Sequence, residues 1–123
     1  NYLGLAFGTI LAGKQMKLQG HGDVVNILST SSFTPHTDEA AYCAAKAASA
    51  MFTQIAMKEL SPEVRIIPIY PGGMKTSFCS NAGIKKTRQS EMNPADVARI
   101  ILSAVSLPRN ITPEIRLYRN AKD

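Results

Sequence analysis

The stretch GDVVNILS, residues 22–29, decides how this chain folds. It opens on a glycine, continues through a mostly apolar run with three β-branched residues, and ends on a serine. Such a short apolar run predicts a strand at residues 24–28 that is covered on both faces, as strands of parallel sheets are. The polar residues 29–39 that follow predict a loop.

Helices are predicted on both sides of this strand. Residues 1–18 carry apolar side chains at helical spacing and stop at the turn sequence GHGD, residues 20–23, so we expect a buried helix there. Residues 40–60 form a long Ala-rich run that Ser61 and Pro62 end. The apolar residues that define the first helix are Leu3, Phe7, Ile10, Leu11 and Leu18.

The pattern then repeats. Residues 64–70 predict a second strand, in which Pro68 should distort the hydrogen-bond ladder. Residues 71–92 show little periodicity, which is typical of a functional lid. The run NPAD, residues 93–96, predicts the start of a third helix that extends to about residue 106, and residues 115–118 alternate as a last strand.

Helix followed by strand, repeated three times, predicts an α/β fold with a parallel sheet and right-handed crossovers. A chain of 123 residues has room for one domain with a real core. Three strands covered on both faces would leave an apolar sheet edge open. We therefore expect the chain to be a single-domain fragment of a larger sheet.

Charge and composition exclude several classes of function. The formal net charge is +5, but the densest basic group, Lys85, Lys86 and Arg88, has no aromatic residues between its members. This argues against nucleic-acid binding and favours a loop near an anionic cofactor or substrate. The apolar stretch 2–13 is shorter than the roughly 20 residues of a membrane span, so no membrane partner is expected.

Cysteine and histidine are scarce. Cys43 and Cys79 are too few for a disulfide framework or a Cys-based zinc site, and His21 and His36 stand alone in the sequence. We therefore expect no metal site, and reduced thiols in a cytoplasmic protein.

A candidate site follows from the strand ends, because ligands of doubly wound sheets bind beyond the carboxyl ends of the strands. Ser29 ends the first strand, while Tyr42 and Lys46 share one helix face at that edge. An ammonium about 4 Å away favours an ionised phenol by roughly 4 kcal/mol at an effective dielectric near 20. The three groups therefore suit acid–base catalysis with a hydroxyl to hold a carbonyl oxygen. The Tyr–Lys spacing alone also fits a surface lysine beside a half-buried tyrosine.

The surrounding residues closely resemble the short-chain dehydrogenase/reductase family. The strand 22–29 ends like the family strand that carries the catalytic serine, and YCAAKAA, residues 42–48, follows at the family spacing. PGGMKT, residues 71–76, is similar to the family's Pro-Gly-x-x-x-Thr segment, and NYLG, residues 1–4, to its Asn-Leu-x-Gly opening. The resemblance implies the carboxyl-terminal, catalytic half of a Rossmann-like doubly wound sheet, without the Gly-rich half that binds the pyrophosphate.

The resemblance also implies a reaction, namely hydride transfer between NAD or NADP and an alcohol or carbonyl substrate. Tyr42 would be the general acid/base, Ser29 would hold the substrate oxygen, and Lys46 would grip the nicotinamide ribose. Asn1 would hold a relay water as the fourth member of the catalytic set. The cofactor-binding residues would be Tyr42, Lys46, Pro71, Gly72 and Thr76, and the side chains expected to line the substrate pocket are Met74, Phe78, Cys79 and Ile84.

Assembly is expected as well. In the resembled family, helices equivalent to residues 1–18 and 40–60 pair with a second subunit, which implies a homodimer or homotetramer. Two alternatives remain open at this point. One alternative to an active oxidoreductase is an inactive fragment of such an enzyme, and the other is a non-catalytic nucleotide-binding scaffold of the same fold.

Overall fold

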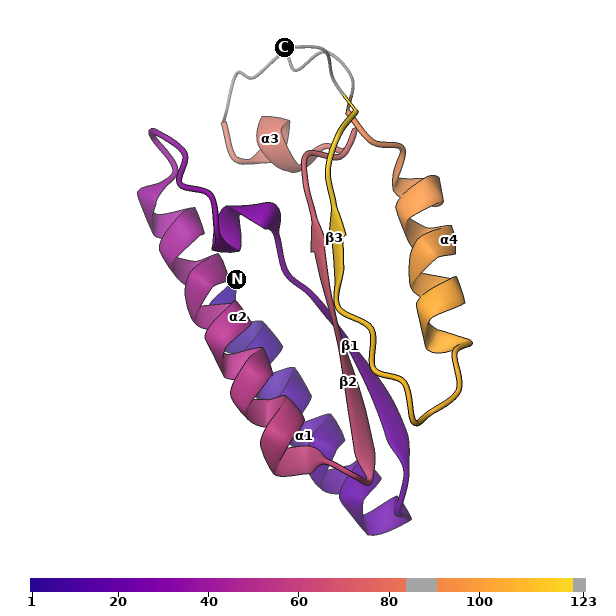
Figure 1. Cartoon of the computed structure of the whole chain (residues 1–123). Helices are drawn as coiled ribbons and strands as arrows, with labels where there is room; N and C mark the ends of the chain where they lie inside the picture. Colours follow the sequence, from indigo (N-terminus) through magenta and orange to yellow (C-terminus); the bar gives the residue numbers. More distant parts are fainter. Residues whose placement is uncertain (84–90, 121–123) are drawn as a thin grey trace.

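The computed structural model describes residues 1–83 and 91–120. Its centre is a parallel sheet in the order β1-β2-β3, formed by β1 (Gly22–Ile27), β2 (Val64–Pro71) and β3 (Ile115–Leu117). Helices α1 (Tyr2–Gln19) and α2 (Ala40–Leu60) cover one face, and α4 (Pro94–Val105) covers the other (Figure 1). The predicted α/β fold with a parallel sheet is confirmed.

The middle strand, β2, forms the core, and every one of its residues is buried. Its side chains alternate between the two faces. Ile66 packs with Ala56 of α2, whereas Ile67 and Ile69 pack with Ala104 of α4. This two-sided burial is why β2 reads as a nearly continuous apolar run rather than as an alternating one.

Pro68 does not distort the sheet, so that prediction was wrong. The pairing of β1 with β2 runs in register through Asn26 and Pro68. Ile69 accepts a hydrogen bond from the Leu28 amide, so the backbone of Ile69 faces β1 and that of its neighbour Pro68 faces β3. Pairing with β3 begins only at Ile69, so the missing N–H of Pro68 falls just before the ladder that would need it.

The apolar face of α1 is also not where the sequence predicted it. Leu3, Phe7 and Leu11 are 60–68% exposed, and the helix instead buries the small residues Ala6, Thr9 and Gly13 against the molecule. Small side chains let a helix approach its neighbours closely, and these large apolar residues point away. The prediction of a buried helix at residues 1–18 was wrong for the large side chains that defined it, all of which are exposed.

A buried polar chain links both helices to the sheet. The Thr9 hydroxyl of α1 donates to Asn26 Oδ1 of β1 at 3.1 Å, and Asn26 Nδ2 donates to Thr53 Oγ1 of α2 at 3.0 Å. Because each of these buried groups has a partner, Asn26 occupies the interior without an unpaired amide. These hydrogen bonds fix the register of α1 and α2 against β1.

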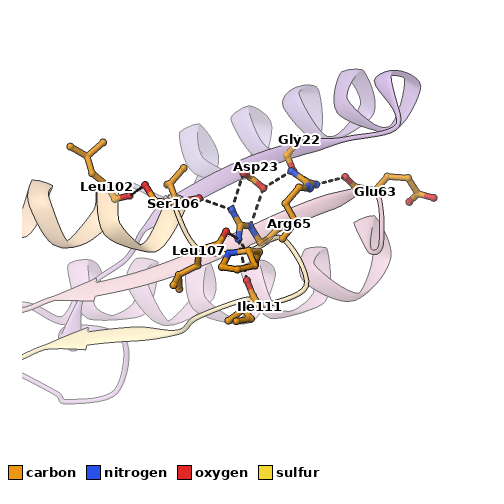
Figure 2. Close-up of polar contacts among 11 residues, drawn as sticks. Gly22, Asp23, Glu63, Arg65, Leu102, Ser106, Leu107 and Ile111 are labelled. Atoms are coloured by element: carbon orange, nitrogen blue, oxygen red, sulfur yellow. Dashed lines mark hydrogen bonds and ion pairs between the residues drawn. The ribbon is translucent and has the colours of Figure 1, made fainter.

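At the amino ends of the strands, Arg65 holds the end of α4 (Figure 2). Its guanidinium makes two hydrogen bonds to Asp23, at 3.0 and 2.9 Å, and its side chain is only 3% exposed. The remaining N–H groups donate to four carbonyl oxygens at and after the end of α4, those of Val105, Leu107, Pro108 and Ile111. A buried arginine in a strand is thus fully partnered, which the apolar reading of residues 64–70 missed.

The segments between these elements carry short structures. The predicted loop 29–39 includes the single-turn helix η1 (Thr30–Ser32), and the predicted lid 71–92 includes α3 (Phe78–Asn81). Backbone hydrogen bonds between Met92 and both Gly73 and Lys75 close the described ends of that lid. Lys85, Lys86 and Arg88 lie outside the described residues.

The start of α4 is as predicted. Asn93 Oδ1 accepts from the Ala95 amide at 2.9 Å, Pro94 occupies the first turn, and Asp96 places a negative charge beside the helix amino terminus. Within residues 1–83 and 91–120, no helix combines the length and the apolarity that a membrane crossing requires.

Candidate active site

A cavity of about 730 Å³ opens at the carboxyl ends of β1 and β2. This is the edge at which the predicted site residues were expected to meet. The predicted residues that line the cavity are Asn1, Ser29, Tyr42, Lys46, Pro71, Gly72, Met74, Thr76, Phe78 and Cys79. The structure therefore brings together segments up to 78 positions apart in the chain, while Ile84 lies outside the described residues.

Ser29 comes two residues after β1 and is 7% exposed. Its backbone is extended, and its Oγ accepts a hydrogen bond of 3.1 Å from the Ser31 amide, which caps η1. A hydroxyl that accepts from the backbone keeps its own proton available for a second partner. Ser29 therefore presents a fixed donor at the edge of the cavity.

Tyr42 and Lys46 lie one turn apart near the start of α2. Lys46 Nζ is 5.9 Å from the centroid of the Tyr42 ring and donates to the Ile27 carbonyl at 3.2 Å. This bond ties the ammonium to the end of β1. Partial burial lowers the pKa of Lys46, because desolvation penalises the charged form.

An aromatic contact closes the lid side of the cavity. The rings of Tyr42 and Phe78 are tilted at 51° with centroids 5.6 Å apart. Phe78 belongs to α3 and is half exposed, so α3 covers the ring face of Tyr42. The predicted apolar lining residues Met74 and Cys79 flank it in the same cavity.

The segment after β2 approaches the cavity with its backbone. The Gly72 amide donates to the Leu117 carbonyl at 2.9 Å, and a Cβ on Gly72 would stand 3.2 Å from that same oxygen. A side chain at position 72 would therefore crowd the backbone of β3 at Leu117. Thr76 Oγ1 accepts from the Phe78 amide at 3.3 Å, which starts the turn into α3.

Asn1 lines the cavity just before α1, and its side chain does not cap that helix. Several cavity residues were missed by the sequence analysis, which treated their segments as an undifferentiated loop, lid or strand end. The signal that could have found them is their position after strand ends, where ligand sites of α/β sheets form. These residues are Thr30, Thr34, His36, Glu39, Glu91, Tyr118 and Arg119.

The described residues form no candidate metal site. In the parts of the chain that the structure describes, no group of three or more His, Cys, Asp or Glu side chains is arranged to hold an ion. Cys43 and Cys79 are free thiols. The cavity instead offers a phenol, a hydroxyl and a cation.

The family model described as "short chain dehydrogenase" matches residues 1–89. An uncharacterized oxidoreductase of Staphylococcus aureus strain USA300 is 30% identical over 112 residues, which is 90% of this chain and 48% of the relative. A 2,5-dichloro-2,5-cyclohexadiene-1,4-diol dehydrogenase of Sphingobium indicum is 30% identical over 107 residues, covering 80% of this chain and 43% of that protein. The chain thus spans about half the length of the curated relatives it matches.

Solved structures agree with the fold. A closed form of a serine dehydrogenase complexed with NADP+ superposes with a TM-score of 0.82 at 26% identity, over 94% of this chain and 50% of that one. A short-chain dehydrogenase/reductase of Vibrio parahaemolyticus gives a TM-score of 0.62 at 33% identity, over 80% of this chain and 43% of that one. The three-stranded sheet is therefore Rossmann-like and matches about half of each of these solved chains.

The comparisons correct one prediction. The chain was predicted to be the carboxyl-terminal catalytic half of the family. The family match instead occupies residues 1–89, so the chain is placed with the Rossmann-like, cofactor-binding part of the domain. The prediction rested on short motifs such as residues 42–48 and 71–76, and short motifs alone do not fix the place of a chain within the family domain.

Proposed function

This chain belongs to the short-chain dehydrogenase family, and from that premise we propose that its cavity serves hydride transfer between a nicotinamide cofactor and an alcohol or carbonyl substrate. The observation that carries the proposal is the meeting of Ser29, Tyr42 and Lys46 in one cavity at the strand ends. The activity belongs to the whole protein, because this chain spans about half the length of its relatives.

Two features of the cavity support a nicotinamide cofactor. Gly72 lines the cavity at the end of β2 and has no side chain to occupy it. Lys46 has three N–H donors, of which Ile27 takes one, so the ammonium can also bind ribose hydroxyls. Pro71, Gly72 and Thr76 would border the nicotinamide end of the cofactor.

The cofactor, when bound, supplies or accepts the hydride. In the reducing direction Ser29 donates a hydrogen bond to the carbonyl oxygen, and Tyr42 donates the proton that this oxygen gains as the carbonyl becomes an alcohol. Lys46 places a positive charge one helical turn from Tyr42 and so stabilises the phenolate that remains. Asn1, at the cavity edge, would hold the water through which a proton returns.

The substrate side is expected to be partly apolar. Met74, Phe78 and Cys79 line it, and Phe78 lies against the ring of Tyr42. Either NAD or NADP fits the proposal. A similar serine dehydrogenase structure contains NADP+, which favours NADP as the first cofactor to test.

The test is Tyr42→Phe in the parent protein, assayed with NADH and NADPH against a panel of alcohols and carbonyls. We expect turnover to fall by about 10²- to 10⁴-fold, since the acid–base group is removed, while cofactor affinity is unchanged. Tyr2→Phe is the matched control, because Tyr2 packs on Phe52 of α2 and not in the cavity. Turnover of Tyr42→Phe within tenfold of the unmodified protein contradicts the role.

We also propose that α1 and α2 form the interface between two copies of the protein. Support comes from the exposed apolar side chains Leu3, Phe7 and Leu11 on α1 and the exposed small residues Ala44 and Ala48 on α2. Small residues on α2 allow close helix approach, while the large ones on α1 supply apolar area.

Light scattering tests this assembly. We expect a dimer or tetramer at micromolar concentration. Phe7→Glu should shift the assembly toward monomer. Leu102→Glu, on α4 at the other face of the sheet, is the control and should not weaken the interface between copies. A monomeric mass for the unmodified protein contradicts the assembly.

A further inference from the structure

Phe33 packs on two neighbouring side chains of the sheet, Tyr70 and Arg116, which also contact each other. Its ring centroid is 4.8 Å from that of Tyr70, and the guanidinium carbon of Arg116 lies 4.2 Å from the Phe33 centroid. Tyr70 and Arg116 are register partners on β2 and β3. The ring is 43% exposed, so this contact, rather than burial in the core, holds it in place.

The backbone between Phe33 and Ser29 is short and hydrogen-bonded. The amides of Phe33 and Thr34 both donate to the Thr30 carbonyl at 3.0 Å, and the Ser31 amide donates to Ser29 Oγ. The Ser32 hydroxyl donates to the Lys46 carbonyl at 2.9 Å, which fastens the same turn to α2. These hydrogen bonds connect the backbone at Phe33 to the Ser29 hydroxyl within one short turn.

Arg116 is itself held in position. Its Nε and one terminal nitrogen donate to Glu114 Oε1 at 3.0 and 2.8 Å. This fixes the plane of the guanidinium beside β3 and leaves its face against the Phe33 ring, an arrangement that suits a cation–π contact.

We propose that Arg116 is a positioning residue for Ser29: its cation holds the Phe33 ring against Tyr70, and the ring holds the turn that presents the serine hydroxyl. This inference rests on the proposed function for the role of Ser29, but the mechanical part of it does not. The last strand of the fold would thereby control the geometry at the end of the first.

The mechanical part is tested by amide hydrogen exchange followed by NMR. In Arg116→Gln the amides of Phe33 and Thr34 should exchange about three- to tenfold faster, because local opening of the turn becomes easier. Arg116→Lys should restore exchange to within about twofold, since it keeps the cation. Arg99→Gln is the matched control, because Arg99 pairs with Asp96 on the exposed side of α4.

Amides of β2 report on global stability in the same spectra and should be unaffected. Glu114→Leu provides a second variant, in which the guanidinium loses its acceptor without being removed and the turn should loosen in the same direction. Unchanged exchange at Phe33 and Thr34 in both Arg116→Gln and Glu114→Leu overturns the proposal.

The catalytic part is tested by kinetics of the parent protein. Arg116→Gln should lower kcat by about five- to tenfold with an unchanged KM for the nicotinamide cofactor, because Ser29 contacts the carbonyl and not the cofactor. A looser turn with unchanged kcat overturns the positioning role. If the unmodified protein has no turnover on any substrate while the turn still loosens, it is the proposed function that fails, and Arg116 remains the group that orders the turn.

Discussion

Arg65 of β2 and Asp23 of β1 are register partners whose side chains form a doubly hydrogen-bonded ion pair at the end of the sheet opposite the cavity (Figure 2). The carboxylate also accepts from Arg109 at 2.8 Å. With the four carbonyl oxygens at and after the end of α4, these contacts engage all three guanidinium nitrogens of Arg65. The pair and its contacts therefore join β1, β2 and the end of α4, which are far apart in the sequence.

We predict that Arg65→Met lowers the free energy of unfolding by about 3 kcal/mol, because it leaves buried carbonyl groups without donors and one side of Asp23 unpaired. Urea unfolding followed by circular dichroism measures this. Arg109→Met is the control: its side chain is 44% exposed, and the expected loss is below about 1 kcal/mol. Equal effects of the two substitutions would contradict the larger contribution of Arg65 to stability.

The lowered pKa of Lys46 should be visible in the pH dependence of the free energy of unfolding. Its pKa is lowered in the folded state, so between that lowered value and the unfolded value near 10.4 the unfolded chain binds more protons. The stability of the unmodified protein should therefore gain from this group as pH rises through that window. Lys46→Met should lack the gain.

At neutral pH, Lys46→Met should cost no more than about 0.5 kcal/mol, because removal of a partly desolvated charge offsets the lost hydrogen bond to Ile27. Lys58→Met, at the exposed end of α2, controls for removal of a lysine charge. Unfolding curves of the three proteins from pH 7 to about pH 11 decide the matter. A large loss of stability at neutral pH would make Lys46 a structural residue.

The Tyr70 hydroxyl is buried and has no hydrogen-bond partner among the described residues. The Gln54 side chain lies close enough to influence the hydroxyl, but without hydrogen-bond geometry. Tyr70→Phe should therefore leave the free energy of unfolding unchanged or raise it by about 0.5 kcal/mol at neutral pH.

Burial, with the negative charge of Glu114, raises the pKa of Tyr70 above its ordinary value. Above pH 10 the unfolded chain then loses the proton before the folded one does, so Tyr70 makes stability fall as pH rises. Tyr70→Phe should show a smaller alkaline loss, measured by thermal unfolding, than Tyr118→Phe, whose ring is 65% exposed. Identical alkaline slopes would contradict the raised pKa.

The elements of this fold were predictable because their signals are local. The Ala-rich run predicts residues 40–60 as a helix, and α2 has those bounds. Asn93 and Pro94 mark the start of α4 for reasons that lie within its first turn. The Asn93 side chain accepts a hydrogen bond from a free amide of that turn, and Pro94 has no amide hydrogen that would need a partner. The candidate site was predictable for a related reason, since parallel strands place their carboxyl ends at one edge.

Exposure and partnership were less predictable. The periodicity of α1 indicated a helix, but Ala6 and Gly13 face the molecule while Phe7 faces away, and periodicity cannot tell which stripe is covered. Pro68 is tolerated only because β3 begins to pair one residue later. Which half of the family domain the chain represents was likewise not fixed by the short motifs that suggested the catalytic half.

The sequence by itself determined the order of helices and strands, the parallel sheet, and the types of side chain that reach its carboxyl edge, because backbone preferences and motif spacing act over a few residues. The tertiary structure alone decided that Arg65 binds the end of α4, that Arg116 lies on Phe33, and that Phe7 and Leu11 of α1 remain exposed. These are contacts between segments far apart in the chain. Their existence depends on how the layers pack, which no local pattern encodes.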